Sequence, residues 1–209
     1  PALDRQIEQS IQRGVAYLKS IQQADGRWTR AIEEMYAERG DLSGVGGLTA
    51  LSLYALASSG VAKDDPAIVR GVKFVLSNPE AFGDGTELAV YANSTLILAL
   101  ARIDPEAHRN AIHDTAQRLS SGQLENGMWA YRIAVRTTAE REKRRKGGVG
   151  LGTPDNSNTQ FAALALWAAQ SAAGYRVPAK TWQRLRDHLL RAQLSDGGWS
   201  YRVSIGSRP

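Results

Sequence analysis

Gln22-Gln23-Ala24-Asp25-Gly26-Arg27-Trp28 is a heptapeptide that returns twice more along the chain, and this repetition decides the fold. The other copies are Gln123-Leu124-Glu125-Asn126-Gly127-Met128-Trp129 and Gln193-Leu194-Ser195-Asp196-Gly197-Gly198-Trp199. All three read Gln-x-x-(Asp/Asn)-Gly-x-Trp. An eroded copy, the second of four turns along the chain, lies at Phe82-Gly83-Asp84-Gly85, with Glu87 at the tryptophan position. Such internal repetition is typical of folds in which one supersecondary unit stacks on the next.

Each copy follows a segment with helical periodicity. Apolar residues recur at steps of three and four before every turn, which gives each helix one apolar stripe. The four stripes are Ile7, Ile11, Val15, Leu18 and Ile21; Ile68, Val72, Val75 and Leu76; Ile112, Ala116 and Leu119; and Leu185, Leu189 and Leu190. The Asp/Asn-Gly pair then ends the helix, because glycine reaches the left-handed conformation that a helix C-terminus requires.

Three segments between these helices have a different character. Residues 47–59, 88–103 and 156–173 are apolar or small on nearly every face, which is typical of a helix buried all round. One-sided and all-round apolar helices alternate, so we expect an outer ring packed around an inner ring. The sequence predicts an all-α fold, an α/α toroid or an open arc of one, with about seven alternating outer and inner helices. An open-ended helical solenoid is the alternative.

The helix count favours the open arc. Seven helices make three hairpins and one further outer helix, which are fewer hairpins than we expect of a closed ring. We therefore expect residues 1–209 to form a single domain that is an incomplete toroid or a piece of a longer protein. Self-association that completes the ring is a further expectation.

The first copy and its helix, Arg13-Gly14-Val15-Ala16-Tyr17-Leu18-Lys19-Ser20-Ile21-Gln22 and on to Trp28, resemble the QW motif of terpenoid cyclases. Over nearly its whole length the chain is similar to the squalene/hopene cyclase and protein prenyltransferase superfamily. The resemblance implies that the Gln and Trp residues of the motif brace neighbouring repeats and take no part in chemistry. It gives this structural role to Gln22, Trp28, Gln123, Trp129, Gln193 and Trp199.

The resemblance also locates a degenerate catalytic motif. Class II terpenoid cyclases carry Asp-x-Asp-Asp, then Thr and Leu-Ala-Leu, at the start of an inner helix, and the middle Asp is the general acid. This chain reads Asp155-Asn156-Ser157-Asn158-Thr159, with Leu-Ala-Leu at 164–166. Ser157 takes the position of the acid, and its hydroxyl cannot protonate an alkene, so we do not expect cyclase activity. Capping of the helix by Asp155 or Ser157 is the plain structural interpretation.

No metal or cofactor is expected. The chain has no cysteine, which excludes thiolate metal sites, including the zinc site that the prenyltransferase resemblance would imply. His108, His113 and His188 are dispersed over outer helices. The glycine-rich segment 147–152 lacks the Gly-Lys-Ser/Thr ending of a phosphate-binding loop.

Any function is expected at the N-terminal ends of the inner helices, where free N–H groups and the helix dipole favour polar ligands. Polar residues gather there, and burying them without partners would be costly. The candidate ligand-binding residues are Asp155, Asn156, Asn158, Gln160, Glu87, Tyr91 and Asn93. A shared polar rim on an apolar cavity would suit an amphiphilic ligand. The rival interpretation is that each residue only caps its own helix.

The sequence therefore favours a non-catalytic or divergent repeat domain that binds a small amphiphilic ligand or a protein partner at these helix ends. The alternative is an enzyme acting on isoprenoids or polysaccharide. Its acid would be Asp155, Glu87 or Asp41, and two of these carboxylates within about 5 to 10 Å would support it.

The net charge of +5 is concentrated in the run Arg141-Glu142-Lys143-Arg144-Arg145-Lys146. This run holds no aromatic residue to stack on bases, so nucleic acid is not expected as a partner. A solvated loop is the plain interpretation, and peripheral contact with an anionic membrane surface is the alternative. No apolar run approaches the roughly 18 to 20 residues of a membrane-spanning helix, so we expect a soluble domain, either cytoplasmic or exported.

Overall fold

The computed structural model describes residues 2–83, 86–133 and 153–201. Within these residues it holds eight α-helices, one short 3-10 helix and no strand, so the predicted all-α class is confirmed. The elements are α1 (Ala2–Ser20), α2 (Ala31–Glu38), α3 (Ser43–Ser58), α4 (Pro66–Ser77), η1 (Pro79–Phe82), α5 (Ala89–Ile103), α6 (Arg109–Ser121), α8 (Asn156–Ala173) and α9 (Ala179–Ala192).

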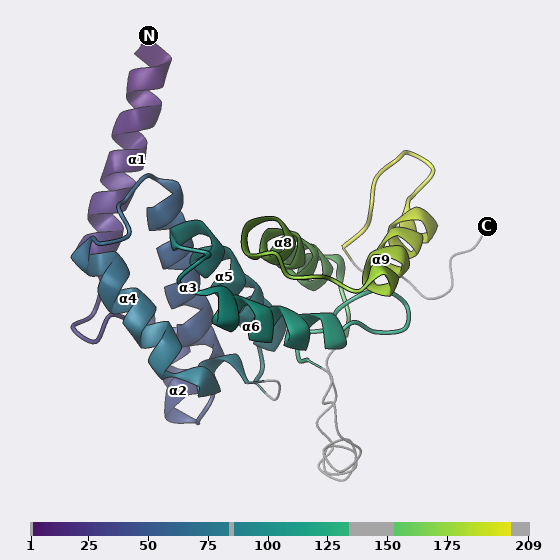
Figure 1. Cartoon of the computed structure of the whole chain (residues 1–209). Coiled ribbons are helices and arrows are strands. Elements are labelled where there is room, and N and C mark those ends of the chain that lie inside the picture. Colours follow the sequence, from purple (N-terminus) through teal and green to yellow (C-terminus); the bar gives the residue numbers. More distant parts are fainter. Residues whose placement is uncertain (1, 84–85, 134–152, 202–209) are drawn as a thin grey trace.

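The inner layer consists of α3, α5 and α8, with α5 packed between the other two (Figure 1). Nearly every side chain from Ala89 to Leu100 of α5 is buried, as expected of a helix without a polar face. Two outer helices cover this layer, because α4 packs on α3 and α6 packs on both α5 and α8. The predicted alternation of outer and inner helices is confirmed.

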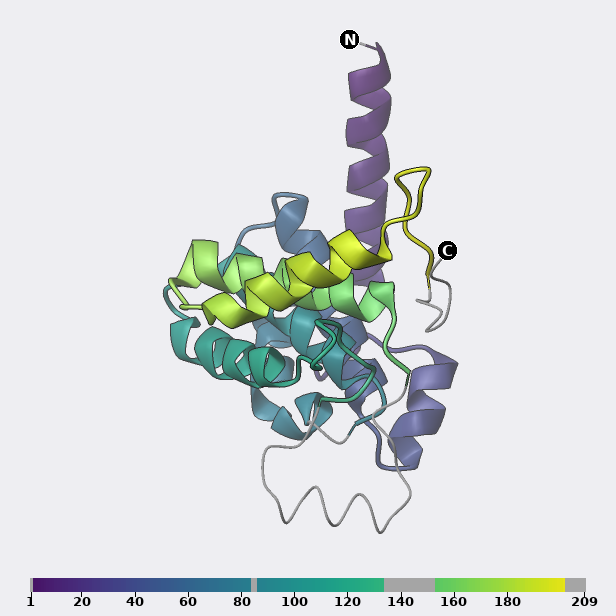
Figure 2. The ribbon, with the colours of Figure 1, turned by 90° about the vertical axis from the view of Figure 1, so that its right-hand side faces the viewer.

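The described residues form an open arc, one of the two forms predicted. Its ends are α1 and α9, which lie on opposite sides of the molecule (Figure 1). α1 projects from the body, and its residues 3–14 are all exposed (Figure 2). The inner helices α3 and α8 lie on either side of α5, so these residues do not close a ring.

One helix was not predicted. α2 has only eight residues, too few for an apolar period to become visible in the sequence. It lies over the start of α3, where a Cβ atom at Gly44 would be 3.0 Å from Cγ of Glu33. The chain therefore has an extra wall beside the N-terminal end of its first inner helix.

The three intact turns share one set of hydrogen bonds. The glutamine Nε2 donates to the carbonyl of the turn glycine at 2.9 to 3.1 Å, in the pairs Gln22–Gly26, Gln123–Gly127 and Gln193–Gly197. The tryptophan Nε1 donates at 2.8 Å to a carbonyl of the preceding helix, in the pairs Trp28–Leu18, Trp129–Leu119 and Trp199–Leu189. The glycine φ angles are 95°, 92° and 85°, so each turn requires the left-handed conformation.

Two of these turns also hold the next outer helix. Gln22 Nε2 donates to the Ala67 carbonyl of α4 at 2.9 Å, and Gln123 Nε2 donates to the Thr181 carbonyl of α9 at 3.0 Å. Their tryptophans, Trp28 and Trp129, are 1% and 0% exposed.

The fourth turn departs from the expectation that every motif tryptophan packs between successive repeats. Trp199 is 48% exposed, because no helix among the described residues packs over it. The internal hydrogen bonds of the turn therefore form without a neighbouring repeat.

Candidate functional site

The N-terminal ends of α3 and α5 are tied together by one carboxylate. Oδ1 of Asp41 accepts hydrogen bonds from N and Oγ of Ser43 at 2.9 and 2.6 Å, and Oδ2 accepts from N of Glu87 at 2.8 Å. Ser43 Oγ in turn accepts from N of Leu88 at 3.1 Å. The polar groups at the two helix starts therefore satisfy one another, and Asp41 is engaged at both oxygens.

A pocket of about 590 Å³ opens beside this link. Its lining comes from α2, the starts of α3 and α5, and the third turn, and consists of Arg30, Glu33, Asp41, Ser43, Gly44, Glu87, Leu88 and Tyr131. Its volume lies within the range of small-molecule sites, roughly 300 to 1,000 Å³. We call it the mouth pocket.

The mouth pocket carries more negative than positive charge. Glu33, Asp41 and Glu87 line it together with one arginine, Arg30. Burial alone would raise the pKa of Glu33, but its hydrogen bonds and its pairing with Arg30 outweigh this and hold the pKa below its ordinary value. Glu87 forms an ion pair with Arg132. Each carboxylate of the pocket wall therefore has a hydrogen-bond or ion-pair partner.

Asp155 belongs to a second polar group, outside the lining of the mouth pocket. It caps α8, since its Oδ1 accepts from N of Asn158 at 2.7 Å and from the Asn158 side-chain amide at 3.0 Å. Its Oδ2 accepts from the Tyr201 hydroxyl at 3.2 Å. Burial would raise the pKa of Asp155, but these hydrogen bonds outweigh burial and lower it. The carboxylate is therefore ionised at neutral pH.

Three tyrosines connect the two polar groups. The Tyr91 hydroxyl hydrogen-bonds to Oγ of Ser157, which lies 3.4 Å from the hydroxyl of Tyr201. Tyr131 lines the mouth pocket and lies edge-on to Tyr91, with 5.8 Å between ring centroids. A hydrogen bond with Tyr201, together with burial, raises the pKa of Tyr131, and burial raises the pKa of Tyr91. Both phenols are therefore neutral at physiological pH.

The candidate residues of the sequence analysis are divided between capping roles and these two groups. Asn93 is fully buried, and its Nδ2 donates to the carbonyls of Phe82 and Ala89. Asn156 Nδ2 donates to the Ser200 carbonyl at 2.7 Å, which joins α8 to the fourth turn.

The remaining candidates lie on the surface, in the Asp155 group or in the mouth pocket. Gln160 is exposed on α8. Asn158 bonds to Asp155, and Tyr91 meets Ser157, which brings the starts of α5 and α8 together. Among the ligand-binding candidates, Glu87 lines the mouth pocket, and among the catalytic candidates, Asp41 and Glu87 share it.

Sequence reasoning missed Arg30, Tyr131 and Tyr201, and one signal could have found them. Each follows the tryptophan of its turn by two residues. In the turn, the backbone N–H of the tryptophan donates to the hydroxyl of a threonine in the first half of an inner helix, Trp28 to Thr49 at 3.0 Å and Trp129 to Thr159 at 3.2 Å. The residue two positions after the tryptophan therefore lies near the N-terminal end of the inner helix.

The part of the chain that the structure describes holds no group of three or more His, Asp and Glu side chains placed to bind a metal ion. None of its helices has both the length and the apolarity needed to cross a bilayer. The basic run 141–146 and the glycine-rich segment 147–152 lie outside the described residues.

Comparison with known proteins supports the relationship that the turns indicate. The family model described as the squalene-hopene cyclase C-terminal domain matches residues 41–207. Searches of curated proteins and of solved structures found no significant match. The match spans the second to fourth turns, all three inner helices and the degenerate Asp155–Thr159 motif. The chain therefore belongs to the squalene-hopene cyclase C-terminal domain family.

Proposed function

We propose that this cyclase-like repeat domain is a binding module. Its mouth pocket takes a small amphiphilic ligand whose polar head is neutral or positively charged. The observation that carries the proposal is the pocket of about 590 Å³ at the starts of α3 and α5.

The lining determines the class of ligand. Arg30 and Arg132 pair with two of the three carboxylates, so the lining keeps a net negative charge that disfavours an anionic head, since like charges repel at short range. Leu88 and the ring of Tyr131 offer apolar surface, and a tyrosine ring also attracts a cationic group within about 6 Å. An ammonium or polyhydroxyl head on a short alkyl chain fits both features.

The lowered pKa of Asp155 does not suit proton donation by this residue. A general acid near neutral pH needs a raised pKa, whereas hydrogen bonds lower the pKa of Asp155 despite its burial. Asp41 accepts three hydrogen bonds, and Glu87 is paired with Arg132. Asp41 and Glu87 share the mouth pocket, which is the grouping that the enzymatic alternative expects, but both carboxylates are already held by these partners, and binding is the function that we propose.

A thermal-shift comparison of three amphiphiles with the same tail tests the proposal. The probes are octyltrimethylammonium, octyl glucoside and octanoate, each below its micelle concentration. Ligand at about 100 times Kd adds roughly 2.7 kcal/mol to the free energy of unfolding, which for a domain of this size raises Tm by about 5 to 10 °C. We expect the ammonium or the glucoside to raise Tm and octanoate to leave it unchanged.

A matched pair of variants locates the effect. Leu88→Trp fills the pocket from its wall, whereas Leu51→Trp changes a similarly exposed leucine of α3 outside the lining. The shift should disappear in Leu88→Trp and persist in Leu51→Trp. A shift that survives in Leu88→Trp, or an octanoate shift as large as that of the ammonium, would overturn the proposal.

A further inference from the structure

Among the described residues, the same joint between repeats occurs twice, and in each the turn glycine lets its backbone lie close to the backbone of the next outer helix. A Cβ atom at Gly26 would lie 2.3 Å from the Arg70 carbonyl oxygen of α4, and one at Gly127 would lie 2.2 Å from the Arg184 carbonyl oxygen of α9. Three residues before each of these carbonyls is the carbonyl that accepts from the turn glutamine. In each joint, a turn contacts two backbone carbonyls that lie three residues apart on an outer helix. One carbonyl accepts the glutamine hydrogen bond and the other lies against the turn glycine. We call the turn the donor of the joint and the outer helix its receiver.

The fourth turn has the donor half of this joint without a receiver. Its Gly197 would place a Cβ atom with no described atom within 4 Å. Gln193 Nε2 bonds to its own turn glycine, and among the described residues it has no second carbonyl partner. Trp199 is 48% exposed, and Leu194 and Leu190 beside it are 49% and 66% exposed.

α1 has the receiver half without a turn. Arg13-Gly14-Val15 repeats Arg70-Gly71-Val72 of α4. On α4, the absence of a side chain at Gly71 makes room for Leu53 of α3 and for Trp28, whose Cδ2 and Cζ3 atoms would lie 2.7 and 2.9 Å from a Cβ atom there. Arg70 also donates to Oε1 of Gln22 at 2.7 Å.

The same positions on α1 are uncovered. Gly14 has no described atom within 4 Å of its Cβ position. Ile11, the counterpart of the buried Ile68, is 38% exposed, whereas Ile68 is 1% exposed. The receiving surface of an outer helix is therefore present on α1 and open.

The ion pair of the first joint has partial counterparts on the open turn and on α1. In the first joint Lys19, near the end of α1, pairs at 2.6 Å with Asp65, which caps the start of α4. Glu8 stands at the position of Asp65 when α1 is the receiver, and Arg191 of α9 is next in sequence to the counterpart of Lys19. The donor therefore carries a basic residue, and the receiver an acidic one, at or next to the positions that pair in the first joint.

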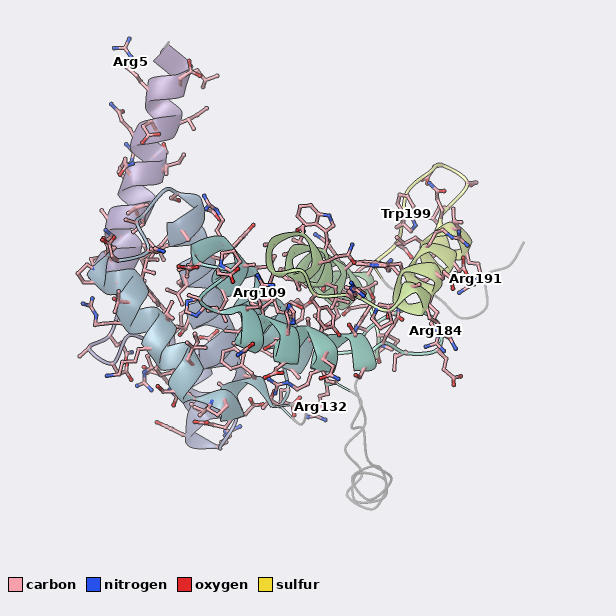
Figure 3. The ribbon with its side chains drawn as sticks, viewed as in Figure 1. Arg5, Arg109, Arg132, Arg184, Arg191 and Trp199 are labelled. Atoms are coloured by element: carbon pink, nitrogen blue, oxygen red, sulfur yellow. The ribbon has the colours of Figure 1, made fainter. Side chains whose placement is uncertain are left out.

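We propose that copies of this chain associate head to tail, with the fourth turn of one copy docked on α1 of the next. Trp199 lies against Gly14, and Gln193 is held between the Ser10 carbonyl and Arg13. The two halves lie at opposite ends of the arc, with Trp199 and Arg191 at one end and Arg5 marking the other (Figure 3). Such a contact is heterologous, so it builds linear chains or closes a ring, and it does not make a two-fold dimer.

Sedimentation velocity on the whole chain, over a wide concentration range, tests the proposal with two complementary variants. Trp199→Ala damages the donor and leaves α1 intact. Gly14→Leu blocks the receiver, and it favours the helix because leucine has the higher propensity. Each variant alone should associate at least about 30-fold more weakly than the wild type, as expected for loss of a central tryptophan contact. An equimolar mixture should give dimers and nothing larger, because it contains one intact donor and one intact receiver.

The controls separate this joint from general stickiness and from unfolding. Trp167→Ala removes another exposed tryptophan, on α8, and should associate like the wild type. Leu194→Glu is a second donor variant in case Trp199→Ala loses its helical circular dichroism. A wild type that stays monomeric throughout, variants that associate as it does, or a mixture that stays monomeric would each overturn the proposal.

Discussion

Replacing the turn glycines with alanine separates the conformational demand of the turn from its contact with the next repeat. Gly127 and Gly197 have φ angles of 92° and 85°, so alanine at either position pays the left-handed cost of about 1 to 2 kcal/mol. Only at Gly127 would the new Cβ also collide with a backbone carbonyl, that of Arg184 at 2.2 Å. Overpacking of this kind costs roughly 1 to 3 kcal/mol more. We therefore expect losses of about 2 to 5 kcal/mol for Gly127→Ala and about 1 to 2 kcal/mol for Gly197→Ala.

Urea denaturation followed by circular dichroism at 222 nm measures both losses, and Gly26→Ala provides a repeat of the Gly127 experiment in the first turn. A Cβ atom at Gly26 would lie 2.3 Å from the Arg70 carbonyl, so its loss should match that of Gly127→Ala. Equal losses for Gly127→Ala and Gly197→Ala would show that the turn conformation alone matters, and would refute the argument that the joint sets the requirement.

Three further predictions concern the tryptophans, the α8 cap and a surface ion pair. Trp129→Ala should lower the free energy of unfolding by about 3 to 5 kcal/mol, and Trp199→Ala by about half as much because Trp199 is half-exposed. The same urea denaturation measures both losses, and equal losses would contradict the burial argument. Hydrogen bonds lower the pKa of Asp155, so its carboxylate stabilises the fold above its unfolded-state pKa of about 3.9 and this contribution is lost as pH falls through the lower folded-state value. Stability should therefore fall more steeply below about pH 4 in the wild type than in Asp155→Asn, and identical acid profiles would disprove this. Lys19→Met should cost only about 0.2 to 1 kcal/mol, and less in high salt, because its pair with Asp65 is partly exposed; a salt-independent loss would point to packing instead.

The inner helices were predictable because residues that are apolar or small on nearly every face indicate a helix that is buried all round. The segment 156–173 was predicted with the bounds of α8, and 88–103 begins one residue before α5. The start of α3 was placed four residues late, at 47 instead of Ser43. Glycines at 44, 46 and 47 weaken helix propensity there, and the helix is held by Asp41, α2 and the start of α5.

The mouth pocket was only partly predictable. Polar residues at helix starts signal that function gathers there, but a sequence does not tell which of them cap their own helix and which face a neighbour. Asn93 and Asn158 turned inward, whereas Glu87 lines the pocket. Two other lining residues, Glu33 and Tyr131, come from a helix too short to detect and from beyond the third turn.

The crystal structure of the chain with octyltrimethylammonium tests the central claim most directly, because it locates the ligand. The account predicts the ammonium group in the mouth pocket, within about 6 Å of the Tyr131 ring centroid and beside Glu33 or Glu87. An empty mouth pocket, with the ligand bound instead against Asp155 or on the outer face of the arc, would contradict it.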